Sequence, residues 1–178
     1  LTGGGDWQAY NMLSAQLVSA RALAIKENTY AGVHLQVADA AANADLADQC
    51  FAAVVLYDPA TQRFNLAPGF RARRVPGGMA FGRLTSDYVN ASGDYIDGAF
   101  GNLEAFTTLT IVFSPAGQAV RSVGGANVIF VNTGLFAGSG TERLWNRTLA
   151  GGDVGLAPVT AVTMFSYKLM KAVAAGER

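Results

Sequence analysis

Five side chains that can offer oxygen ligands crowd one short, glycine-containing stretch of the sequence. They are Asp87, Asn90, Ser92, Asp94 and Asp97. Calcium takes about six to eight oxygen ligands at flexible geometry, so the carboxylates of Asp87, Asp94 and Asp97 are candidate Ca²⁺ ligands. The spacing does not match the EF-hand loop, and Asp, Asn and Ser are also the usual residues of turns. Residues 87–102 are therefore expected to form a long surface loop, with calcium binding as the less favoured interpretation.

The residues that most often carry catalysis or bind zinc are scarce. His34 is the single histidine and Cys50 the single cysteine, too few for a Cys/His zinc site. No Gly-x-Ser-x-Gly turn is present to hold a nucleophile for His34. The alternation of residues around His34 predicts that it faces solvent or is lightly packed, and Cys50 is expected to be a small buried side chain. The sequence thus favours a protein that is not an enzyme and has no cofactor.

The charge balance argues against nucleic acid as a partner. Thirteen basic residues offset thirteen acidic ones, giving a net charge of zero, whereas nucleic-acid binders usually carry a basic excess that neutralises phosphates. The one basic cluster is Arg71, Arg73 and Arg74, which we expect on a solvated strand edge or loop. Apolar residues make up 51% of the chain, which predicts a well-filled core.

The N-terminal part of the chain has the pattern of a helix over residues 6–26. One apolar stripe recurs at steps of three and four residues, and we predict that it packs on a sheet: Tyr10, Leu13, Leu17, Ala20 and Ala24. Asp6 is the expected N-cap and Asn28 the expected stop. The glycines at 3–5 precede this helix without a strand or a phosphate-binding Lys, so they are expected to be a flexible tether.

After residue 28 the periodicity changes to two, which indicates strands. Residues 31–37 alternate as in a half-buried strand, and a turn at 58–61 should join strands 51–57 and 64–66 in a hairpin. Further extended segments are expected at 75–81, 108–113, 118–123, 127–131 and 159–165, with a turn at 114–117. A loop or short helix is expected at 38–49, a loop at 151–158, and a helical pattern at 166–174.

These elements predict an α+β fold in which one N-terminal helix packs on an antiparallel meander, with a short C-terminal helix. A length of 178 residues suits a single domain spanning 1–178, made of the helix at 6–28 and a β-rich head at 29–178.

Three segments, in this order, resemble the minor pilins and pseudopilins of type IV pili and type II secretion systems. The first is the helix at 13–28, which contains an Ala-Arg pair and then Ala24-Ile25-Lys26 before a polar stop. The second lies within 69–84 and contains Val75-Pro76-Gly77-Gly78-Met79-Ala80-Phe81. The third is a hairpin region, Ile111-Val112-Phe113-Ser114-Pro115-Ala116-Gly117-Gln118-Ala119. Together they cover about half of the chain.

The resemblance implies a non-enzymatic filament subunit whose partners are other pilin or pseudopilin subunits. Family members begin with a peptidase site and a strongly apolar helix that carries a Glu, and neither is visible before Leu1. Because the sequence also lacks an initiating Met, we expect that such a helix precedes it in the natural protein and anchors it in the inner membrane. The implied location is the bacterial inner membrane and periplasm, or a filament on the cell surface.

The residues also allow a second function. A β-rich extracellular head could recognise a sugar, a peptide or Ca²⁺ through the loop at 87–102, because binding residues concentrate on loops held by a rigid scaffold. The two functions are compatible, since a filament tip can carry a ligand site.

Overall fold

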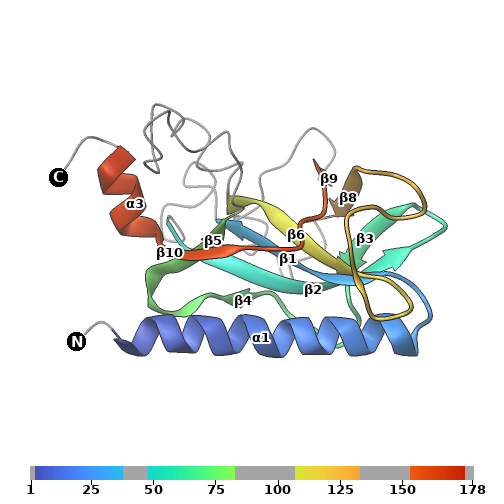
Figure 1. Ribbon diagram of the computed structural model, residues 1–178, viewed down its shortest axis with the longest axis horizontal. Helices are drawn as coiled ribbons and strands as arrows, with labels where there is room; N and C mark the ends of the chain where they lie inside the picture. The colour runs from blue at the N-terminus through green and yellow to red at the C-terminus, as the bar shows by residue number, and fades with distance from the viewer. Residues whose placement is uncertain (1–2, 38–47, 83–106, 133–152, 175–178) are drawn as a thin grey trace.

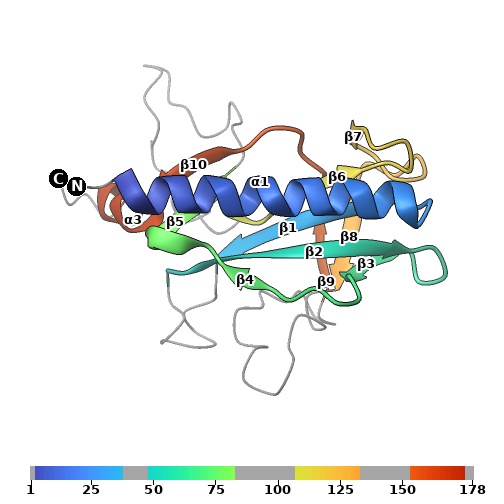
Figure 2. The same ribbon diagram turned by 90° about the horizontal axis from the view of Figure 1, so that it is seen from below.

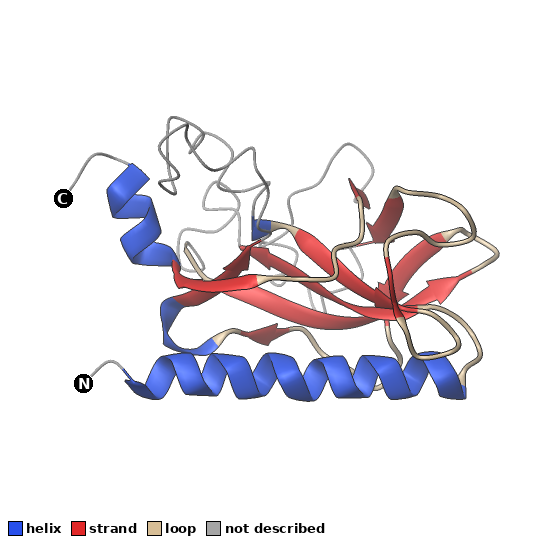
Figure 3. Ribbon diagram, viewed as in Figure 1, coloured by secondary structure: helices blue, strands red, loops and turns tan. Residues whose placement is uncertain are grey.

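The computed structural model describes residues 3–37, 48–82, 107–132 and 153–174 (Figure 1). A long helix, α1 (Gly3–Lys26), runs along one face of a β-sheet, and a short helix, α3 (Tyr167–Ala174), follows the last strand. The strands are β1 (Ala31–Val37), β2 (Cys50–Asp58), β3 (Arg63–Leu66), β4 (Arg73–Arg74), β5 (Met79–Gly82), β6 (Leu109–Phe113), β7 (Ala119–Val120), β8 (Ile129–Asn132), β9 (Asp153–Leu156) and β10 (Thr163–Ser166). The predicted α+β class, with a helix on a mostly antiparallel sheet and a short C-terminal helix, is confirmed (Figure 3).

The order of the strands differs from the predicted meander. The main sheet runs β7-β6-β1-β2-β3-β8-β9, with β4 paired to β2, while β5 and β10 form a separate pair. β3 and β8 are parallel, and β6 returns to pair with β1 rather than with the preceding strand. A meander pairs only consecutive strands, whereas here the apolar strand β1 is covered on both edges by β2 and β6.

Helix α1 is longer at its N-terminus than predicted. The glycines at 3–5 are helical rather than a tether, and Asp6 lies inside the first turn rather than at the cap. A carboxylate there still favours the helix, because the N-terminal end of a helix carries partial positive charge. Asn28 ends the helix as predicted: its φ is 49°, and the next amide, of Thr29, donates to the carbonyl of Ala24 at 3.2 Å.

The side of α1 that packs on the sheet contains three of the five predicted residues, and Leu13, Ala20 and Ala24 are confirmed as buried. Its buried residues are Ala9, Leu13, Gln16, Ala20 and Ala24. Leu17 is partly buried at the margin. Tyr10 was predicted on this side and is 54% exposed, so that assignment is wrong. Ala9 packs on the sheet instead. It lies four residues before Leu13, and residues four apart share one face of a helix.

Strand β1 is buried along its whole length, not half-buried as its alternation predicted. Val33, Leu35 and Val37 face α1. The other side of β1 consists of Gly32, His34 and Gln36, which are also buried. A second apolar cluster, from the neighbouring strands, includes Phe64, Val112 and Val131 of β3, β6 and β8. A sheet that is covered on both faces has no solvated side. The alternating pattern therefore wrongly predicted that one face of β1 is exposed to solvent.

The two turns with strong local signals are confirmed. In the β2–β3 turn, Asp58 accepts hydrogen bonds of 2.9 Å from the amide of Ala60 and the hydroxyl of Thr61. In the turn after β6, the amide of Gly117 donates to the carbonyl of Ser114 at 2.8 Å. Residues 151–158, predicted as a loop, contain β9, which pairs with β8.

Candidate functional site

Helix α1 has apolar residues on the side that faces away from the sheet as well as on the packed side. Large apolar side chains there are exposed: Trp7 by 65%, Tyr10 by 54%, Val18 by 70% and Ile25 by 51%. Trp7, Val18 and Ile25 are separated by eleven and seven residues, close to whole numbers of helical turns, so they lie on one line along the helix. Figure 2 shows that no described strand covers α1 on this side.

The N-terminal end of this outer face is an aromatic pair. The rings of Trp7 and Tyr10 are stacked, with centroids 5.8 Å apart and planes inclined by 12°. Exposed aromatic and aliphatic side chains that line up on one surface are typical of a protein–protein contact, because isolated domains rarely leave such surface in water. We call Trp7, Tyr10, Val18 and Ile25 the outer face of α1.

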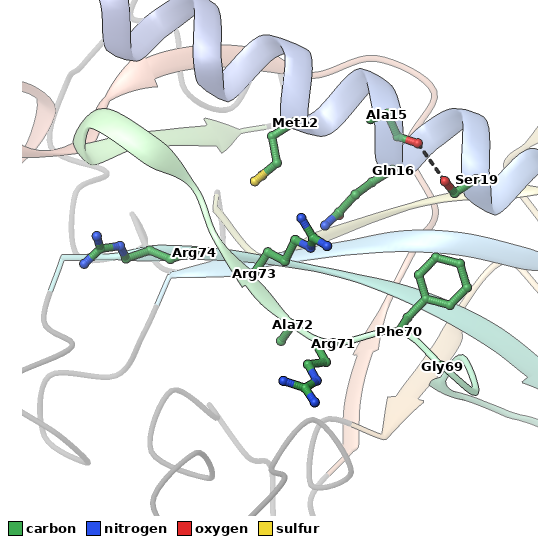
Figure 4. Close-up of a pocket in the computed structure, with 10 residues that line it drawn as sticks. All are labelled: Met12, Ala15, Gln16, Ser19, Gly69, Phe70, Arg71, Ala72, Arg73 and Arg74. Atoms are coloured by element: carbon green, nitrogen blue, oxygen red, sulfur yellow. Dashed lines mark hydrogen bonds between the residues drawn. The ribbon is translucent and has the colours of Figure 1, made fainter.

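A pocket of about 820 Å³ lies along the flank of α1, between the packed side and the outer face. Met12, Ala15, Gln16 and Ser19 form its helical wall, since residues at these spacings share one side of a helix. The opposite wall is the segment from Gly69 to Arg74, which ends in β4 (Figure 4). The pocket therefore lies between α1 and a segment that is distant from it in sequence.

The pocket contains one buried polar group without a partner. Gln16 is only 8% exposed, and within the described part of the chain its side-chain oxygen Oε1 has no hydrogen-bond donor. Figure 4 shows Gln16 and Arg73 pointing toward one another, while Arg71 and Arg74 extend away from the helix. Leaving a buried carbonyl oxygen unpaired is unfavourable by about 1–3 kcal/mol, so the side-chain oxygen of Gln16 destabilises the fold by an amount of this order.

The strand wall of the pocket is strongly positive. Arg71, Arg73 and Arg74 are exposed, as the sequence predicted for this cluster. Among the described residues no carboxylate forms an ion pair with any of them, and the guanidinium of Arg74 reaches only the side-chain oxygen of Gln49, at 3.4 Å. The strand wall of the pocket thus carries exposed guanidinium groups, of which that of Arg73 lies toward Gln16 (Figure 4).

His34 is fully buried, which corrects the prediction that it faces solvent. Its Nδ1 lies 2.9 Å from the hydroxyl of Thr110 on β6, and its Nε2 lies 3.1 Å from the side-chain oxygen of Gln36. Burial lowers the pKa of His34 to about 4, while the hydrogen bond with Gln36 acts in the opposite direction. The imidazole is therefore neutral at pH 7, with both ring nitrogens engaged in the core.

Cys50 is buried, as predicted, with 1% of its surface exposed. Burial raises the pKa of its thiol to about 12. Because the thiolate is the reactive form, this cysteine is chemically inert in the folded protein.

The candidate calcium ligands Asp87, Asp94 and Asp97 lie outside the described residues, as does the rest of the 87–102 loop. The sequence did not point to the pocket, although it contained two signals: a glutamine on the packed side of α1 and three arginines within four residues. Within the described ranges, no group of three or more His, Cys, Asp or Glu side chains is arranged to hold a metal.

None of the helices in the described part of the chain has the length and apolar character needed to span a membrane. The chain was also compared with known proteins. No protein-family model, no curated protein sequence and no solved structure matches it.

Proposed function

We propose that this protein is a non-enzymatic structural subunit of a type IV pilus-like filament or of a type II secretion pseudopilus. The pilin-like features of the sequence motivate the class, and the arrangement of α1 on the sheet is compatible with it. In such a subunit one long helix forms a spine and the sheet forms a head. α1 and the strands on which it packs correspond to these two parts.

The observation that carries the proposal is that α1 is apolar on two opposite sides. Its packed side is already buried by the sheet, and Trp7, Tyr10, Val18 and Ile25 lie outside the two buried apolar clusters, although Ile25 also lies beside Gly117. Each of these side chains is between half and three quarters exposed. Burying the exposed part in an interface would stabilise that interface by about 1 kcal/mol per residue. A subunit that packs its helix against neighbouring subunits would bury these apolar side chains in the interface.

The proposed partners are other subunits of the same filament, and the proposed location is the bacterial inner membrane and periplasm or the cell surface. Anchoring in the membrane would come from an apolar helix preceding Leu1. The buried, neutral His34 and the inert Cys50 are consistent with a role that requires no catalysis.

Site-specific photo-cross-linking of the natural full-length protein in its own cells tests this proposal. The photoreactive amino acid p-benzoylphenylalanine replaces Val18 on the outer face of α1, and in a matched control it replaces Asn127, which is exposed in a turn of the head. We expect adducts with another copy or another filament subunit at position 18, identified by mass spectrometry, and fewer at position 127. Absence of adducts at position 18, or equal yields at both positions, would contradict the assembly role.

A further inference from the structure

We propose that the pocket between α1 and the Gly69–Arg74 segment binds a small molecule that carries a carboxylate on an apolar body. The inference goes beyond the assembly role and does not depend on it, because the pocket lies on the flank of α1 and not on its outer face. It rests on three properties of the pocket: two hydrogen-bond donors that face one another, one cation that faces the helix, and an apolar wall.

The first property is a pair of donors without an acceptor. Figure 4 shows the side-chain nitrogen of Gln16 directed toward the guanidinium of Arg73, while the Gln16 oxygen is buried and takes no part in the site. Gln16 is only 8% exposed, and among the described residues neither its amide nitrogen nor the guanidinium of Arg73 has an acceptor. Both groups donate and neither accepts, so they cannot bond to each other. A ligand that reaches both must therefore bring acceptor oxygens.

The second property is the positive charge that faces the helix. Arg73 points toward α1, whereas Arg71 and Arg74 extend away from it (Figure 4). Within the described ranges no carboxylate forms an ion pair with Arg73. A guanidinium binds a carboxylate through two parallel N–H···O bonds that are stronger than bonds between neutral groups. One guanidinium matches the single charge of a carboxylate, whereas a phosphate dianion would keep one charge without a partner on this side.

The third property is the apolar surface that accompanies these donors. Met12 and Ala15 of α1 and Phe70 of the opposite wall line the same pocket. Its volume of about 820 Å³ lies within the range of roughly 300–1,000 Å³ that is typical of small-molecule sites, where a few polar groups orient a ligand against mainly apolar walls. An inorganic anion would leave the apolar wall in contact with water, whereas the body of an organic acid would cover it.

A nuclear magnetic resonance titration of the isotope-labelled protein with phenylbutyrate tests the proposal. The probe joins a carboxylate to an apolar body, and phenylbutyramide has the same body without the charge. The Nε–H signal of Arg73 and the side-chain amide signals of Gln16 report binding at the site. Arg73→Gln and Gln16→Met each remove one donor and leave the other as the reporter. Arg121→Gln is the matched control, because Arg121 is an exposed arginine outside the pocket and its loss changes the net charge equally.

We expect phenylbutyrate to shift both sets of signals with a Kd of about 1 mM, and the amide to bind about tenfold more weakly. Arg73→Gln should weaken binding by a similar factor and Gln16→Met by about fivefold, whereas Arg121→Gln should leave it within about twofold. Three results would overturn the inference. They are the absence of a saturable shift at Arg73 up to about 10 mM probe, an equal loss in the Arg121→Gln control, and binding of the amide or of inorganic phosphate as tight as that of phenylbutyrate.

Discussion

Mild acidification should destabilise the fold through His34. The unfolded chain takes up a proton at the ordinary histidine pKa of 6.5, whereas the buried imidazole has its pKa lowered to about 4. Between these values the unfolded state binds more protons than the folded state, so the free energy of unfolding decreases as the pH falls. The contribution of His34 is unchanged above about pH 7 and is lost progressively from pH 6.5 down to pH 4.

The magnitude follows from the two pKa values. Their full difference corresponds to about 3 kcal/mol, of which about 2 kcal/mol is lost between pH 7 and pH 5. That window is the informative one, because carboxylates in the unfolded chain titrate mainly below it. His34 is the only histidine in the sequence, so no other imidazole contributes to the change.

Urea denaturation at pH 7 and pH 5 measures this effect, with His34→Gln as the control. Glutamine offers both a donor and an acceptor to Thr110 and Gln36 but does not titrate. We expect the natural sequence to lose about 2 kcal/mol between the two pH values and His34→Gln to remain nearly constant. An equal loss in both proteins, or no loss in either, would refute the assignment of a buried neutral imidazole.

Other predictions concern packing and metal binding. Gly32→Ala would place a Cβ 2.3 Å from a backbone oxygen of β6 and should lower the free energy of unfolding by more than about 2 kcal/mol. Gly4→Ala meets nothing within 4 Å in helix α1 and should raise it by up to about 1 kcal/mol; a comparable loss in both would contradict the close contact at Gly32. Gln16→Met should stabilise the protein by about 1 kcal/mol in urea denaturation, because it removes an unpaired buried oxygen, and a destabilised variant would show that the oxygen is satisfied. If the loop at 87–102 binds calcium, millimolar Ca²⁺ should raise the Tm; an unchanged Tm would remove that interpretation.

The sequence predicted the elements whose signals are local. The helix over 6–26 has good helix-forming residues and a continuous apolar periodicity, and α1 covers this range. The hairpin turn at 58–61 is specified by Asp58 and its neighbours, and the turn at 114–117 by Pro115 and Gly117. Such signals require no knowledge of the rest of the chain.

The errors arose where distant residues decide the structure. His34 is fully buried between Ala53 of β2 and Thr110 of β6, the residues opposite it on the two neighbouring strands, and alternation within β1 cannot reveal those neighbours. β9 forms by pairing with β8, although its own sequence resembles a loop. The pocket at Gln16 likewise depends on the approach of the Gly69–Arg74 segment to α1, so neither wall predicts it alone.

The buried polar contact of His34 also bears on how the strands choose their alignment. Much of β1 and β2 consists of small or β-branched apolar residues that would pack acceptably in several registers. A one-residue slip of β1 would turn His34 toward α1, and a two-residue slip would separate it from Thr110, which lies directly opposite on β6. Either slip would break the contact between the buried imidazole and Thr110, which costs free energy, whereas a slip of apolar side chains alone breaks no hydrogen bond between side chains. The polar group in the core thus excludes the misaligned sheets that an entirely apolar strand would tolerate.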